Sequence, residues 1–166
     1  MSATAHRSAI KAVRGTLLYC RDDPFLVGSR GAMVEVPDGL VVCRDGVIEA
    51  VGPYAKLAPG LPPEAEVADH SGCLITPGFI DTHIHYVQTG IIGAQGHRLL
   101  DWLNNYTYPA ELAFADVALA RETAELFCDE LLRNGTTTAL VFCSVHAGSV
   151  TALFEAASAR NMRLIA

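Results

Sequence analysis

Residues 77–85 read PGFIDTHIH, and at this stretch the pattern of the chain changes. The segment from Phe79 to His85 is predicted to be a short strand that follows the turn-forming pair Pro77-Gly78. Side chains alternate along a strand, so His83 and His85 should share one face while Ile84 lies on the other. Two imidazoles placed in this way can bind one metal ion. Asp81 has the same parity and is expected to orient a ligand.

Strands and helices are expected to alternate after residue 77. Apolar residues at spacings of three and four predict a helix that Asp116 caps at its start and Asn134-Gly135 at its end. Residues 136–143 are predicted to form a strand buried on both faces, Ser149 to cap a second helix, and residues 163–166 to begin a third strand. This order predicts an α/β fold with parallel pairing and right-handed crossovers. A doubly wound sheet and an eight-stranded barrel both satisfy the pattern.

Residues 1–76 are predicted to belong to a small β domain, and residues 77–166 to a second domain. The clearest signal is a hairpin, in which residues 41–43 and 47–49 flank a turn at Asp45-Gly46. Four prolines between Gly52 and Glu64 predict a loop in that segment.

Composition limits the class of protein. Lys and Arg number 12 and Asp and Glu 18, so the formal net charge is 12 − 18 = −6, with 51% apolar residues. These values exclude a disordered chain and predict no attraction to nucleic acid or anionic membranes. Charged residues make up 18% of the chain, whereas a soluble domain usually has about 25%. A low charged fraction of this kind is typical of a segment of a larger folded protein. The five cysteines are odd in number and widely spaced, and no signal peptide or membrane span is evident, so a reduced, cytoplasmic protein is predicted.

For most of the other histidines and cysteines, a structural role explains the sequence better than a role in catalysis or metal binding. His146 follows a predicted strand, so it could lie near the mouth of the site, but a solvated loop histidine is the favoured interpretation. His70 and His97 have no partner at ligand spacing and are predicted to lie on the surface. Cys143 is expected to pack in the core, since nothing near it in sequence would activate a thiolate. Trp102 could stack on a flat ligand or anchor its own segment by packing.

Beyond residues 77–85, three features carry a resemblance to a known family. Gln88 and Gly93 are followed by the run HRLLDWLNNYTYPAE at residues 97–111, expected to be a loop, and by LLRNGTTT at residues 131–138. Together they resemble the guanine deaminase family of the amidohydrolase superfamily, over most of residues 72–166. The resemblance implies a (β/α)8 TIM-type barrel, incomplete in this chain, preceded by a small β-sandwich-like domain.

The resemblance also implies a chemistry. His83 and His85 would bind one catalytic zinc per chain, with iron as the alternative metal, and Gln88 would hydrogen-bond the purine. If Trp102 stacks on a flat ligand, that ligand would be guanine. A zinc-bound hydroxide would convert guanine to xanthine and ammonia. In such enzymes the proton-transfer residues and further metal ligands follow later in the barrel, so no catalytic residue is assigned here and the 166-residue chain is expected to be inactive alone.

Several alternatives remain at this stage. Another deaminase or a cyclic amidohydrolase of the same superfamily, or a non-catalytic barrel scaffold, would share the two histidines. A cytidine-deaminase design is excluded, because the chain has neither H-x-E nor P-C-x-x-C. The resembling enzymes are homodimers as a rule, and a homodimer is expected for the full-length form.

Overall fold

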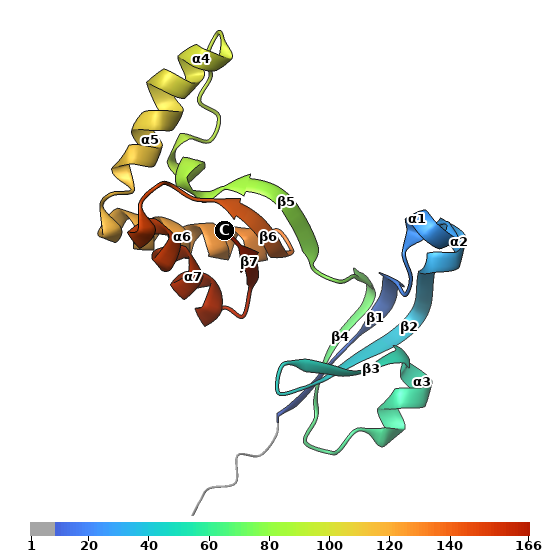
Figure 1. Cartoon of the computed structure of the whole chain (residues 1–166). Helices are drawn as coiled ribbons and strands as arrows, with labels where there is room; N and C mark the ends of the chain where they lie inside the picture. Colours follow the sequence, from blue (N-terminus) through green and yellow to red (C-terminus); the bar gives the residue numbers. More distant parts are fainter. Residues whose placement is uncertain (1–8) are drawn as a thin grey trace, which may run out of the picture. The chain divides into compact units, whose positions relative to one another are not determined.

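The computed structural model describes residues 9–166. The chain divides into two compact units, Met1–Pro77 and Gly78–Ala166 (Figure 1). No helix in the described part is both long enough and apolar enough to span a membrane.

The first unit contains a four-stranded sheet with the order β3-β2-β1-β4. Its strands are β1 (Ile10–Cys20), β2 (Met33–Arg44), β3 (Val47–Pro53) and β4 (Glu66–Ile75). β2 pairs antiparallel with β1 and β3, whereas β4 pairs parallel with β1. The predicted hairpin is confirmed, since Asp45 and Gly46 connect β2 to β3 with φ angles of 52° and 83°. A tight turn of this kind needs positive φ at both positions.

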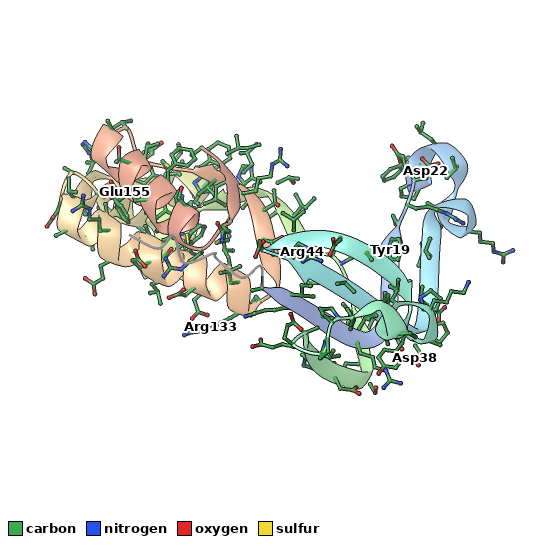
Figure 2. The ribbon with its side chains drawn as sticks, turned by 90° about the horizontal axis from the view of Figure 1, so that it is seen from below. Tyr19, Asp22, Asp38, Arg44, Arg133 and Glu155 are labelled. Atoms are coloured by element: carbon green, nitrogen blue, oxygen red, sulfur yellow. The ribbon has the colours of Figure 1, made fainter. Side chains whose placement is uncertain are left out.

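Short helices complete the first unit: α1 (Pro24–Val27), α2 (Ser29–Ala32), α3 (Tyr54–Leu57) and η1 (Ala58–Gly60). Its core contains Ala12, Leu40 and Val42, and several half-buried apolar side chains, including Tyr54 and Leu57 of α3, pack against it. Ion pairs join Arg14 to Asp38 and Arg44 to Glu49. Asp38 and Arg44 of this unit are labelled in Figure 2.

Two features of this unit differ from the sequence predictions. The segment expected to be a loop contains α3 and η1, because Pro53 precedes the first helix and Pro59 falls in the first turn of the second. A proline in a first turn removes no helical hydrogen bond. The strand β4 was not predicted, because nearly all of its side chains are exposed and show no alternation. The described residues of this unit form one sheet, so the second layer of the expected sandwich stays a prediction.

The second unit contains the parallel sheet β5-β6-β7, as predicted. Its strands are β5 (Phe79–His85), β6 (Thr136–Phe142) and β7 (Arg163–Ile165), connected through the helices α6 (Val117–Arg133) and α7 (Ala147–Ala159). The predicted caps of α6 are confirmed: Asp116 accepts hydrogen bonds from the Ala118 and Leu119 backbone, and Gly135 has a φ of 82° just after the helix. The buried cluster of this unit includes Tyr86, Phe127 and Leu153.

Burial of β6 on both faces was predicted and is wrong. Ala139 and Val141 are buried, but 38% of Leu140 and 41% of Phe142 is exposed. The buried residues belong to the core cluster with α6 and α7, which covers one face of the strand. Ser149 was also misassigned as a cap: α7 begins at Ala147, and the buried Ser149 hydroxyl donates to the carbonyl oxygen of His146 at 2.9 Å.

The expected loop at residues 97–111 is largely helical. It contains α4 (Leu99–Trp102), the π-helical turn η3 (Leu103–Thr107) and α5 (Tyr108–Ala113), preceded by η2 (Tyr86–Ile91). Pro109 lies in the first turn of α5, directly after the π-helical turn. Isolated π turns of this kind occur often at functional sites.

Candidate metal centre

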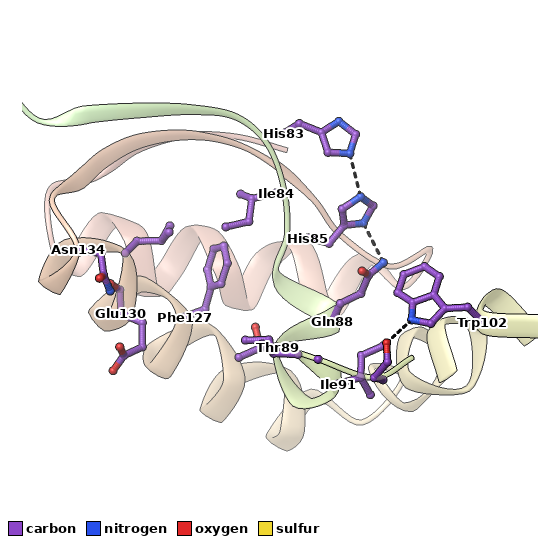
Figure 3. A pocket seen from close by; sticks show the side chains of 14 residues that line it. His83, Ile84, His85, Gln88, Thr89, Ile91, Trp102, Phe127, Glu130 and Asn134 are labelled. Carbon is purple, nitrogen blue, oxygen red and sulfur yellow. Dashed lines mark hydrogen bonds between the residues drawn. The ribbon is translucent and has the colours of Figure 1, made fainter. Parts of the chain in front are cut away.

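Two imidazoles meet at the carboxyl end of β5. The Nε2 atoms of His83 and His85 lie 3.2 Å apart (Figure 3). The predicted placement of the two side chains on one face is therefore confirmed. The pairing of β5 with β6 shifts register between Asp81 and Ile84, and an irregularity in a strand can change the direction of its side chains. Asp81 accepts a hydrogen bond from the His83 backbone N–H at 2.9 Å. Among residues 9–166 it therefore supports the backbone of β5 and contacts no imidazole, contrary to expectation.

Phe142 on β6 supports both imidazoles. Its ring centroid lies 4.6 Å from that of His83 and 4.7 Å from that of His85, and it stacks on His85 at 17°. Phe142 and His85 are register partners in the sheet. Sequence reasoning missed this contact, because Phe142 stands in a continuous apolar strand that marks no residue as special.

The imidazole pair fits a metal ion. Two nitrogen ligands of a tetrahedral zinc ion, each at 2.0–2.1 Å from it, lie about 3.3 Å apart, close to the 3.2 Å observed. Burial and the neighbouring His83 lower the pKa of His85, against an opposing effect of Glu111, and this favours the neutral imidazole that metal binding requires. Among residues 9–166 no three His, Cys, Asp or Glu side chains gather at one point. The pair therefore supplies part of a metal site.

Gln88 lies beside this pair, on η2. Its side-chain nitrogen is 3.2 Å from Nδ1 of His85 and 3.2 Å from Oε1 of Glu111 on α5. Glu111 was given no role from the sequence. The available signal was its charge, because Glu111 is the only charged residue between positions 102 and 115.

Trp102 is held by its own segment. Its indole N–H donates to the carbonyl oxygen of Ala94 at 3.0 Å, and a Cβ on Gly96 would lie 2.6 Å from the Cβ of Trp102. These contacts support the anchoring interpretation. The side chain also lines a pocket of about 500 Å³ together with His83, His85 and Gln88, so all four predicted site residues border one cavity.

The remaining candidates lie outside this group. His70 and His97 are exposed, as predicted. His146 precedes α7, and its Nε2 is buried with no hydrogen-bond partner in residues 9–166, so the prediction of a solvated loop histidine is wrong. Burial raises the pKa of the Cys143 thiol, which agrees with a packing role and not with an activated thiolate.

Comparison with known proteins defines the class. Residues 74–166 match the Amidohydrolase family, so the chain belongs to that family. Over 160 residues it is 47% identical to guanine deaminase of Escherichia coli strain K12, a match that covers 95% of this chain and 36% of the relative. It is 40% identical over 161 residues to a probable guanine deaminase of Deinococcus radiodurans, again covering 95% of this chain and 36% of the relative. The chain thus spans about a third of the length of these relatives.

Solved structures agree with the sequence comparison. E. coli guanine deaminase superimposes with a TM-score of 0.85 at 45% identity, covering 93% of this chain and 36% of that one. Guanine deaminase of C. acetobutylicum, solved with guanine bound in its active site, superimposes with a TM-score of 0.74 at 28% identity, covering 93% of this chain and 35% of that one.

Proposed function

We propose that the full-length protein hydrolyses guanine to xanthine and ammonia. By full-length protein we mean this chain joined to the residues that its relatives carry outside the matched region, encoded with it or supplied from the E. coli relative. The observation that carries the proposal is the His83 and His85 pair, with Gln88 beside it in the same pocket. The identity of 47% to a guanine deaminase supports the choice of substrate.

In the proposed architecture, residues 77–166 form the first βα units of a (β/α)8 barrel and residues 1–76 belong to a small β domain. Three parallel strands in sequential order, with helices between them, support the barrel. Barrel enzymes place their sites at the carboxyl ends of the strands. His83 and His85 lie at that end of β5.

The proposed metal is zinc, held by His83 and His85 with further ligands from the rest of the full-length protein. A bound zinc ion lowers the pKa of a water ligand to about 7 and so supplies hydroxide at neutral pH. The stacked Phe142 ring keeps the two imidazoles in place. Gln88 binds the purine edge by hydrogen bonds, and Trp102 closes one side of the pocket, where its ring restricts the access of water.

The test measures zinc content and ammonia release from guanine in the full-length protein. We expect about one zinc per chain, and we expect both zinc and activity to be lost in His83→Ala and in His85→Ala. The matched control is His70→Ala, because His70 is an exposed histidine of the first unit. A protein that binds zinc and releases ammonia from another heterocycle, but not from guanine, would retain the metal site and refute the substrate. Light scattering on the same samples tests the proposed homodimer.

A further inference from the structure

We propose that Glu111 is a positioning residue that fixes the direction of the Gln88 carboxamide and thereby makes Gln88 a hydrogen-bond acceptor toward the purine. The inference rests on the proposed function and extends it to one chemical feature of the substrate. The group that meets Gln88 would be an N–H donor, either a ring N–H or an exocyclic amine.

The chemistry of the contact sets the direction of the amide. An ionised carboxylate only accepts hydrogen bonds, whereas a carboxamide has an NH₂ end that donates and an oxygen end that accepts. The Gln88 atom 3.2 Å from Oε1 of Glu111 is therefore the nitrogen. With the amide reversed, its oxygen would face the carboxylate, and two acceptors would repel each other.

The second contact of Gln88 strengthens the dependence on Glu111. The same nitrogen lies 3.2 Å from Nδ1 of His85, and this contact requires Nδ1 to accept. When His85 binds a metal through Nε2, the ring proton resides on Nδ1, which then is a donor that faces the Gln88 NH₂ group, itself a donor. Without Glu111 the amide would then reverse and accept from Nδ1–H through its oxygen. Within the described part of the chain, Glu111 is the charged acceptor that holds the nitrogen end in place against this reversal.

The oxygen end of Gln88 is left for a ligand. Within residues 9–166 no donor reaches Oε1 of Gln88, although the side chain is half-buried and lines the pocket that His83 and His85 also border. Gln88 comes from η2 and Glu111 from α5, which are separated by 23 positions in the sequence. The folded structure, and not local sequence, therefore fixes the direction of the amide.

The kinetic test is a double-mutant cycle in the full-length protein. Glu111→Gln replaces the carboxylate by a carboxamide, which can both donate and accept and therefore permits either direction of the Gln88 amide. We expect the KM for guanine to rise about tenfold, as for loss of a charged hydrogen bond, with zinc content unchanged and kcat little affected. In a Gln88→Ala background the same substitution should have no further effect, because Glu111 acts through Gln88. Additive effects would overturn the proposal. Glu122→Gln, at an exposed carboxylate of α6, is the matched control.

A second readout does not depend on activity. In protein labelled with ¹⁵N-glutamine, the side-chain NH₂ signal of Gln88 is identified by its absence from Gln88→Ala. This signal should shift in Glu111→Gln and stay in place in Glu122→Gln. An unchanged signal in Glu111→Gln overturns the proposal whatever the substrate is. A shifted signal in a protein that does not hydrolyse guanine retains the Glu111 contact and refutes only the proposed function.

Discussion

At the scale of single residues, the buried side chain of Tyr86 in the core of the second unit makes a hydrogen bond whose contribution to stability can be measured. The side chain is fully buried, its ring meets Phe114 edge to face, and its hydroxyl donates to the carbonyl oxygen of Ser149 at 2.8 Å. Tyr86→Phe keeps the ring and removes the donor, which leaves a buried acceptor. We expect the free energy of unfolding to fall by about 1–2 kcal/mol, measured by urea unfolding. The control is Tyr108→Phe, at an exposed tyrosine, which should change stability by much less.

The same contact predicts a pH dependence. Burial raises the pKa of Tyr86 from 10.0 to about 12, against a smaller opposing effect of its hydrogen bond. Because the folded pKa is above the unfolded one, the stabilisation is complete below pH 10 and is lost as the pH rises toward 12. The stability difference between the wild type and Tyr86→Phe should therefore shrink across that range. Cys128, whose pKa burial raises to about 11, titrates in both proteins and cancels in the comparison. A difference that stays constant from pH 9 to pH 12 would contradict the assignment.

Residue chemistry also explains which parts of the site were predictable. The two histidines share a face because of the two-residue period of a strand, a local rule that sequence alone provides. The contact between Gln88 and Glu111 depends on how α5 returns to η2, and no periodicity connects those positions. The role of Phe142 depends on register with a strand more than 50 positions away in sequence. Local geometry was therefore accessible from the sequence, and contacts between elements were not.

At the scale of elements, the helix α6 depends on its N-terminal cap. Asp116 Oδ1 accepts from the N–H of Ala118 at 2.8 Å and of Leu119 at 3.4 Å, and so satisfies two amides that the helix itself leaves without partners. Asp116→Ala should lower stability by about 1 kcal/mol, whereas Asp116→Asn, which retains a side-chain acceptor, should stay close to the wild type. Thermal unfolding of both variants checks this. Equal losses in the two variants would show that the charge of Asp116, and not its cap geometry, stabilises the helix.

The elements also differ in how well the sequence predicted them. The strand β5 and the ends of α6 agree with prediction, because turn and cap residues mark them locally. The helical run from α4 to α5 was read as a loop, since Pro109 and two asparagines weaken every helical signal there. The exposed face of β6 could not be foreseen, because an apolar strand has the same composition whether or not another layer covers it.

At the scale of the whole molecule, the site needs more ligands than residues 9–166 bring together. Those residues place two imidazoles at the end of β5, and no third His, Cys, Asp or Glu among them joins the pair in a group that could hold a metal ion. A catalytic zinc site usually has three protein ligands and one open position. With two protein ligands in place of three, zinc binds more weakly, because fewer protein ligands replace the water molecules that the ion loses on binding.

The difference in the number of ligands predicts that the 166-residue chain and the full-length protein differ in zinc affinity. At a free zinc concentration that loads the full-length protein with about one ion per chain, the 166-residue chain should hold far less zinc and release no ammonia from guanine. Metal analysis after equilibrium dialysis measures the first quantity, and an ammonia assay the second. His83→Ala in the short chain should abolish the remaining zinc, which shows that it is bound by the β5 pair. If the short chain instead holds one zinc as tightly as the full-length protein, this chain itself supplies the third ligand, and the division of the site proposed above is wrong.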